Sequence, residues 1–367
     1  MKVGIYTFHA GTNYGAMLQA YATQRVINSF NGVEAEVVNL YMNNDVARNV
    51  YIEKVHSLKD LAKDIYAIIN PQVWKKCANF RKFHDAMSLS KRYGSKDEIY
   101  ANPPIYDVHV AGSDQIWNLE SGFHEKNYFF LDFLKGNEMR ISYAPSFGNP
   151  NIPITLYPKL KQLLSKFSAI STREKGGVEL IKKATGLDAA LVLDPTLLLT
   201  GAQWKSIISD EPIIKGAYIA FYGFATSDDI EKIYKSLRRA LNIPIVAMSV
   251  STFIPYKVDR FVQSAGPAEF LNIIYHAKYV LTGSFHGLAF AVNFRKDFVV
   301  IRQGKRMARM ESLLDIMGLK ERIVATEEEL MNLLGKSTHV DYSNGMAQVE
   351  RMRIRSIDWL QKALKIS

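Results

Sequence analysis

The chain has little cysteine and no long apolar run, and both absences narrow its class. Its one cysteine, Cys77, cannot form a disulfide within the chain or supply a thiolate zinc cluster. No window reaches the roughly 18 consecutive apolar residues that a transmembrane helix needs. The opening MKVGIYTFHAGTNYG lacks the small-residue cleavage site of a signal peptide. We therefore expect a soluble protein of a reducing compartment, the cytoplasm.

Several familiar catalytic signatures are also missing. The sequence contains no HExxH, CxxC, GxSxG or Walker lysine motif, and its first glycine-containing loop is not a GxGxxG fingerprint. The segment Asp194-Pro195-Thr196 is interpreted as a turn rather than as a metal site. We expect no metal and no cofactor.

What the chain does have is an excess of positive charge. Its formal net charge is +10 and its pI is about 9.3, which favours anionic partners. Nucleic acid is not expected, because no basic run is interleaved with aromatic residues. The charge would allow peripheral association with an anionic membrane face. One basic segment is either a solvated helix face or a phosphate contact, and it contains Arg302, Lys305, Arg306 and Arg309.

The pattern of apolar residues predicts an α/β fold with two domains. Short apolar strands alternate with helical patterns, such as the helix expected over Asp228 to Leu241, and this alternation predicts mostly parallel sheets. We expect a first domain over 1–165 with a helical insertion at about 42–100, and a second over 166–335. A C-terminal helix within 336–367 is expected to pack back across the domains. Such sheets bind ligands at the carboxyl ends of their strands, so a site is expected in the cleft between them.

Two segments of the first half carry polar residues where predicted strands end. The first presents backbone N–H groups at the start of a helix, which suits an anion, although a plain tight turn explains it equally well; it contains Gly11, Thr12, Asn13 and Tyr14. In the second segment, Asp114 could accept a proton from a sugar hydroxyl and Trp117 could stack on a sugar face. The alternative makes Asp114 a helix cap and places Trp117 in the core.

Two further segments lie in the same position relative to later strands. Arg173 suits forked recognition of a carboxylate or phosphate, but a surface Arg–Glu pair would explain it too. His286 follows a strand and the turn residue Ser284, and it begins an apolar helix. An imidazole there can exchange a proton near neutral pH or bind an anion when it is charged. A structural histidine is the alternative.

Taken together and in this order, the segments resemble the polysaccharide pyruvyl transferase family. The resemblance extends from residue 6 to about 319, and residues 42–100 match least. The stretches that carry it are YTFHAGTNYGAMLQAYA, VAGSDQIWN, YFFLDF, ISYAPSFG, STREKGG, LDPTLLL, GSFHGLAFAVNF and RMARMESLLDIMGL.

This resemblance implies two Rossmann-like domains facing a cleft, as in the B-type glycosyltransferase fold. It also implies transfer of pyruvyl from phosphoenolpyruvate to a sugar of a cell-surface glycan, such as an exopolysaccharide, or of its precursor, with formation of a pyruvate ketal and no strict need for a metal. By position in the matching stretches, Arg173 and His286 would contact the donor, with Ser284 beside them in the substrate site. Our own extension from location makes Asp114 the base for the acceptor and lets Arg306 or Arg309 contact a phosphate of a lipid- or nucleotide-linked acceptor.

Two other functions remain compatible with the sequence. The same architecture would suit a glycosyltransferase that uses a nucleotide sugar, because fold alone does not fix function. A carbohydrate-binding protein that kept the fold without catalysis is the second alternative. A dinucleotide-dependent redox enzyme is disfavoured by the missing glycine fingerprint.

Overall fold

In a computed structural model of the chain, all hydrogen-bonded strands run parallel to their neighbours. The structure describes residues 1–40, 65–119, 127–223, 228–251, 254, 257–302 and 307–366. The first sheet has the order β2-β1-β3-β4. Its strands are β1 (Lys2–Tyr6), β2 (Glu34–Val37), β3 (Val108–Ala111) and β4 (Met139–Ser142). A parallel bridge between Ile141 and Ala169 extends this edge towards the pair β5 (Ser171–Thr172) and β6 (Ala190–Leu191).

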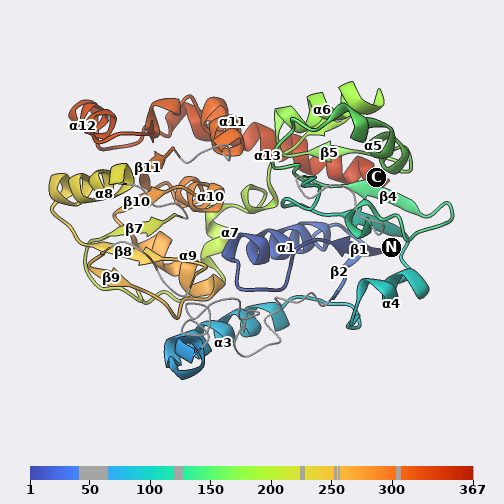
Figure 1. Cartoon of the computed structure of the whole chain (residues 1–367), viewed down its shortest axis with the longest axis horizontal. Coiled ribbons are helices and arrows are strands. Elements are labelled where there is room, and N and C mark those ends of the chain that lie inside the picture. Colours follow the sequence, from blue (N-terminus) through green and yellow to red (C-terminus); the bar gives the residue numbers. More distant parts are fainter. Residues whose placement is uncertain are drawn as a thin grey trace.

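The second sheet has six strands in the order β12-β11-β10-β7-β8-β9. Its central strands are buried along their whole length, as parallel sheets covered on both faces require. Figure 1 shows the two sheets side by side with helices packed around each. The strands are β7 (Ile219–Tyr222), β8 (Ile245–Met248), β9 (Arg260–Phe261), β10 (Tyr279–Thr282), β11 (Asp297–Ile301) and β12 (Ile323–Val324).

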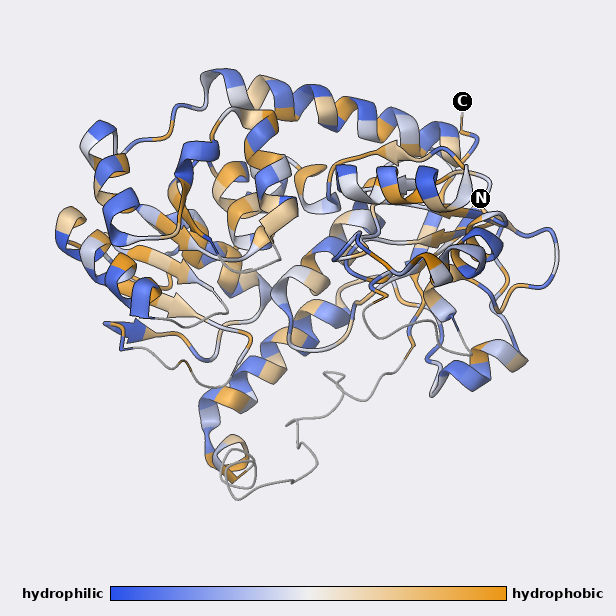
Figure 2. Ribbon diagram, turned by 45° about the horizontal axis from the view of Figure 1, so that its top comes forward, coloured by the Kyte–Doolittle hydropathy of each residue, from blue (hydrophilic) through white to orange (hydrophobic). Residues whose placement is uncertain are grey.

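The helices cover the sheets with their apolar faces, and Figure 2 shows orange residues turned towards the strands. Asn13 begins the first helix by accepting a hydrogen bond from the Ala16 N–H at 3.2 Å, and Thr326 caps α12 in the same manner. The helices are α1 (Tyr14–Ile27), α3 (Pro71–Asp85), α4 (Lys96–Ala101), α5 (Tyr157–Leu164), α6 (Lys175–Thr185), α7 (Gly201–Lys205), α8 (Asp228–Leu241), α9 (Pro267–His276), α10 (Phe285–Asn293), α11 (Ala308–Met317), α12 (Glu327–Lys336) and α13 (Ser343–Ala363), with short 3-10 turns η1 (Tyr128–Phe130), η2 (Ile154–Leu156), η3 (Pro195–Leu197) and η5 (Lys320–Arg322).

The strand pairing differs from the expected division of the chain at 165/166. The Ser142 N–H donates to the carbonyl oxygen of Ala169 at 3.1 Å, and the Ser168 N–H donates to that of Arg140 at 2.8 Å. These bonds place residues up to β6 on the edge of the first sheet. The sequence could not show this, because strands and helices alternate in the same way on both sides of residue 165.

Two helices connect the halves of the molecule. Helix α13 runs from the second sheet to the first along one side (Figure 1), where the Trp359 ring lies 6.3 Å from that of Tyr143. Helix α3, in the region expected to be a helical insertion, packs on α9, and Lys76 Nζ donates to the carbonyl oxygens of Ser249 and Val250 at 2.8 and 2.7 Å. Residues 42–64 of that region lie outside the described residues. None of the described helices is both long enough and apolar enough to cross a membrane.

Candidate active site

A cluster of charged side chains lies between the two sheets, where strands of both sheets end. Asp114 follows β3 and Arg173 follows β5, while Asp194 comes after β6. From the second half, His286 lies in the first turn of α10 after β10, and Arg309 lies in the first turn of α11 after β11. The carboxyl ends of parallel strands are the usual ligand sites of such sheets, so the topology itself assembles the cluster.

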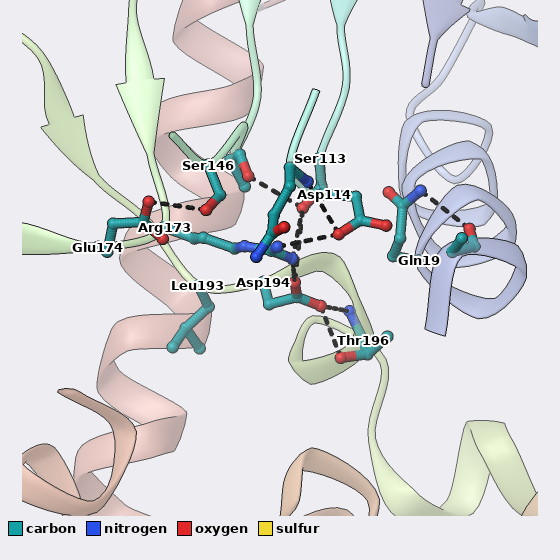
Figure 3. Close-up of polar contacts among 12 residues, drawn as sticks. Gln19, Ser113, Asp114, Ser146, Arg173, Glu174, Leu193, Asp194 and Thr196 are labelled. Atoms are coloured by element: carbon teal, nitrogen blue, oxygen red, sulfur yellow. Dashed lines mark hydrogen bonds and ion pairs between the residues drawn. The ribbon is translucent and has the colours of Figure 1, made fainter. Parts of the chain in front are cut away.

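Arg173 is the centre of this cluster. Its Nη1 lies 2.5 Å from Asp194 Oδ2, its Nη2 lies 3.1 Å from Asp114 Oδ1, and Nη1 also donates to Ser113 Oγ at 3.4 Å (Figure 3). Its side chain is 1% exposed, so the alternative of a surface Arg–Glu pair is wrong. The Nε–H of Arg173 has no partner among the described residues. A buried guanidinium is thus held by two carboxylates and keeps one donor unused.

The two carboxylates differ in how tightly they are held. Asp194 is fully buried, and its Oδ1 also accepts from the Thr196 N–H at 3.0 Å and the Thr196 hydroxyl at 2.7 Å. The Asp114 side chain is 14% exposed, and its backbone has a positive φ of 72°, a conformation that non-glycine residues rarely adopt. Asp194 therefore fixes Arg173 in place, while Asp114 is the partner that an incoming anion could replace.

Burial and charge act in opposite directions on these carboxylates. Burial alone would raise the pKa of Asp114, but the positive charges of Arg173 and Arg309 outweigh it and hold that pKa below its usual value. The pKa of Asp194 is lowered for the same reason, chiefly by Arg173. Both carboxylates are ionised at neutral pH, and Asp114 is a weak base while it is paired with Arg173.

His286 lies against the first helix of the other half. A Cβ atom placed on Gly15 would come within 2.0 Å of His286 Nδ1, so only glycine leaves room for the ring there. His286 is 7% exposed, and its Nε2 has no hydrogen-bond partner among the described residues. Burial lowers its pKa to about 4, although Asp194 and Asp114 oppose the shift. The imidazole is therefore neutral at pH 7 in the protein alone.

A second arginine completes the cluster. The guanidinium carbons of Arg173 and Arg309 lie 5.6 and 5.5 Å from the centre of the Phe285 ring, within the range of cation–π contacts. Burial, together with the like charge of Arg173, lowers the pKa of Arg309 to about 10. Since the guanidinium stays charged at pH 7, two cations and the His286 ring surround one small region. The expected alternative for this cation, Arg306, lies outside the described residues.

Comparison with known proteins decides the family of this chain. The model of the polysaccharide pyruvyl transferase family matches residues 13–304, which include every residue of the cluster except Arg309. The chain belongs to this family. No curated protein sequence matches it.

Solved structures show how this pyruvyl transferase family member is built. A UDP-N-acetylglucosamine 2-epimerase from Rickettsia bellii superposes with a TM-score of 0.52 at 11% identity, covering 99% of this chain and 98% of that chain. The UDP-GlcNAc 2-epimerase from Neisseria meningitidis, bound to UDP-GlcNAc, gives a TM-score of 0.51 at 11% identity, covering 99% and 100%. At this identity the likeness shows the fold alone, and it confirms the predicted two-domain arrangement of the B-type glycosyltransferases.

A cleft of about 510 Å³ opens beside the cluster of this pyruvyl transferase family member. Its cations are paired with acids: Lys320 with Asp315 at 2.7 Å, and Arg302 with Glu311 at 2.8 Å. The cleft is therefore polar without a strong excess of either charge among its described residues. It is lined by Gly148, Pro150, Glu174, Lys175, Gly176, Arg302, Ala308, Glu311, Ser312, Asp315, Lys320 and Ile323.

The rings of two of the expected ligand residues lie in the core. Trp117 is fully buried, its ring stacks 5.1 Å from that of Phe130, and its indole N–H donates to the carbonyl oxygen of Phe129 at 3.1 Å. Tyr14 is fully buried as well, stacked 4.7 Å from Phe270. The expectation that the Trp117 ring stacks on a sugar is wrong, because aromatic residues beside polar loops also fill cores. The expectation for Tyr14 concerned its backbone N–H, and burial of its ring does not bear on it.

The remaining expected residues lie around the cluster. Gly11, Thr12 and Asn13 are at least partly exposed and precede α1, whose Gly15 touches His286. Ser284 precedes α10 without capping it through its side chain. The described residues contain no group of three or more histidine, cysteine or acidic side chains that could hold a metal.

Two carboxylates of the site are not among the residues expected from the sequence. Asp194 was interpreted as a turn residue, and it does begin the turn η3, but it is also the closest partner of Arg173. Glu174, next to Arg173 in sequence, is 5% exposed and lines the cleft. The signal for Asp194 was the stretch LDPTLLL itself, because a polar residue directly after a strand at the carboxyl edge is a site candidate.

Replacing Gly15 by alanine tests the contact between α1 and His286. Alanine normally favours a helix over glycine. Here the added methyl group would overlap the imidazole, so we expect a loss of about 1–3 kcal/mol in the free energy of unfolding, as for overpacked cores. Urea unfolding measures it. Gly335→Ala, in α12 with open space around it, is the control and should not destabilise the protein; equal effects at both sites would contradict the contact.

The buried imidazole also predicts a dependence of stability on pH. The pKa of His286 falls from 6.5 in the unfolded chain to about 4 in the folded protein, so its contribution is complete above pH 6.5 and is lost as the pH falls towards 4. The loss is about 3 kcal/mol from one group. His9 and His109 have pKa values lowered to about 4 as well and add to the total effect. Urea unfolding of the wild type and of His286→Gln at several pH values isolates the contribution of His286. The free energy of unfolding of the wild type relative to that of the variant should fall below pH 6.5. The same pH dependence of this free energy in both proteins would contradict the assignment.

Proposed function

We propose that this protein transfers a pyruvyl group from phosphoenolpyruvate to a sugar of a cell-surface glycan or its precursor and forms a pyruvate ketal. The observation that supports it most is the placement of Arg173, Arg309 and His286 around one buried region between the sheets. The donor carries a phosphate and a carboxylate on adjacent carbons, so an enzyme needs several cationic donors close together to hold it.

The residues have distinct parts in this proposal. Arg173 offers its unused Nε–H, and its Nη2 as well when Asp114 moves away. Arg309 binds the second anionic group of the donor. His286 presents its unpartnered Nε2 to the phosphate. A phosphate dianion beside it would raise its pKa and favour the protonated ring, which can then donate a proton to the departing phosphate.

Other parts of the proposal follow from location. Gly11, Thr12, Asn13 and Ser284 contribute hydrogen bonds at the starts of α1 and α10, where the positive ends of helices favour an anion. A phosphate of a lipid- or nucleotide-linked acceptor would lie near Arg302, which pairs with Glu311 of α11. We place the reaction in the cytoplasm, in keeping with the single, unpaired Cys77, and association with an anionic membrane face would bring the enzyme to a lipid-linked acceptor.

A glycosyltransferase or epimerase reaction on a UDP-sugar is the second candidate, since the structural neighbour from Neisseria meningitidis binds UDP-GlcNAc. The two candidates make opposite predictions for ligand-induced stabilisation. A ligand that binds only the native state raises the melting temperature, by an amount set by its concentration relative to Kd. Thermal unfolding with phosphoenolpyruvate, UDP and inorganic phosphate in parallel therefore separates them. A rise with phosphoenolpyruvate supports the proposal, and a rise with UDP alone overturns it.

A further inference from the structure

One carboxylate oxygen beside the site accepts no hydrogen bond from the part of the chain that the structure describes. Glu174 precedes α6 and is 5% exposed. Its Oε1 accepts hydrogen bonds from the Ser146 hydroxyl at 2.7 Å and the Phe147 N–H at 3.1 Å (Figure 3). Its Oε2 is buried and accepts none from the described residues. Buried polar atoms are nearly always hydrogen-bonded, so this oxygen lacks a donor that a ligand could supply.

The other two carboxylates of the site are engaged elsewhere. Asp194 is bound by Arg173 and by both donors of Thr196. Asp114 is paired with Arg173, whose positive charge makes it a weak base. Glu174 differs from both, because no described residue donates to its Oε2, and this oxygen is left for a substrate hydroxyl.

Glu174 also lies at the boundary between the cationic cluster and the neighbouring cleft. It follows Arg173 directly, and its negative charge acts on both Arg173 and Arg309. It lines the cleft of about 510 Å³, together with Ala308, the residue before Arg309. Glu174 is therefore the residue of the cleft lining that directly adjoins Arg173 in sequence.

The walls of the cleft suit a neutral polyhydroxy compound. Gly148 and Gly176 line it without side chains. A Cβ on Gly176 would meet Pro150 Cγ at 2.9 Å, so the two residues are in close contact and leave no room for a side chain between them. The charged side chains around the rim are paired, as Arg302 with Glu311, and such groups exchange hydrogen bonds with hydroxyls. The cleft volume of about 510 Å³ lies in the range of pockets that bind small ligands.

We propose that this cleft binds the acceptor sugar and that Glu174 Oε2 is the base for the hydroxyl that attacks the donor. The assignment rests on the function proposed above. The first hydroxyl forms a bond to C2 of phosphoenolpyruvate and gives its proton to Glu174, while a proton adds to C3, which becomes a methyl group. The second hydroxyl then bonds to C2 and loses its proton, and the C2–O bond to phosphate breaks. Phosphate departs with one proton, so two protons leave the hydroxyls, one is gained by C3 and one by phosphate.

The test uses the full-length protein and the variant Glu174→Gln. Glutamine keeps an oxygen for Ser146 and Phe147 but replaces Oε2 by an amide that cannot take a proton. Glu179→Gln, an exposed position of the same helix α6, is the matched control. Sugar binding is followed by saturation-transfer NMR with methyl β-D-galactopyranoside and methyl β-D-mannopyranoside in the presence of phosphoenolpyruvate. Phosphate release from phosphoenolpyruvate is then measured with glycan precursors extracted from cells.

We expect Glu174→Gln to weaken sugar binding about tenfold, the effect of one hydrogen bond to a charged group, and to slow phosphate release roughly a hundredfold or more. Stabilisation by phosphoenolpyruvate should be unchanged, and Glu179→Gln should behave as the wild type. Unchanged sugar binding and phosphate release in Glu174→Gln would overturn the inference, as would absence of sugar binding in the wild type. If the inference fails in either way but phosphoenolpyruvate still binds to the wild type and to Glu174→Gln, the proposed function is not contradicted. If sugar binding depends on Glu174 but phosphoenolpyruvate does not bind, the donor is wrong and the cleft is right.

Discussion

The variant His286→Ala is expected to lose at least about a hundredfold in the rate of phosphate release from phosphoenolpyruvate, because loss of a general acid typically costs this much. His286 is the residue of the cluster that can both bind phosphate and give it a proton. Its Nε2 is buried and unpartnered among the described residues, which is the state of an atom that is completed by a ligand. Stabilisation by phosphoenolpyruvate should also weaken, since one contact to the donor is lost.

The control for this variant is His339→Ala. His339 is exposed and pairs with Asp297 at 2.8 Å, away from the cluster. It should keep both the rate and the response to phosphoenolpyruvate. A His286→Ala protein that releases phosphate as fast as the wild type would remove the imidazole from the mechanism.

The variant Asp194→Ala is expected to lose about 3–5 kcal/mol in the free energy of unfolding, because removing one partner of a buried ion pair leaves an uncompensated charge. The side chains of Asp194 and Arg173 are at most 1% exposed, and the contact of Arg173 with Asp194 is shorter than its contact with Asp114. Urea or thermal unfolding measures the loss.

Two further proteins make this prediction specific. Asp188→Ala removes an exposed partner of Lys182 from the same half of the chain and should change stability little. Adding Arg173→Met to Asp194→Ala should recover part of the stability, since the unpaired cation is then gone. A loss in Asp194→Ala no greater than that in Asp188→Ala would show that the buried pair does not stabilise the fold.

Much of the fold follows from local patterns in the sequence. The helix expected over Asp228 to Leu241 has those bounds as α8, because acidic residues begin it and one apolar face runs through it. Apolar runs near Tyr218, Ile245, Val280 and Val299 predict strands, and β7, β8, β10 and β11 lie there. β9, with only two residues, Arg260 and Phe261, was missed because so short a strand has no measurable period.

The site was predictable in its positions but not in its pairings. The carboxyl ends of predicted strands led to Asp114, Arg173 and His286, all of which the fold brings into one region. The contact of Arg173 with Asp194 joins two loops of the same sheet edge, and no spacing in the sequence indicates which carboxylate a buried arginine will select. Burial could not be predicted either. Trp117 is an aromatic residue of the kind that stacks on sugars, but it lies in the core.

Calorimetric titration of the protein with phosphoenolpyruvate near pH 7.5, repeated in buffers of different ionisation enthalpy, tests the central claim most directly. The donor is expected to bind with net uptake of protons, because His286 is neutral in the free protein and its pKa rises beside the phosphate. The proton uptake should vanish in His286→Gln. Absence of binding, or binding of UDP in place of phosphoenolpyruvate, would contradict the proposed function. Binding of phosphoenolpyruvate with no proton uptake would contradict the part assigned to His286.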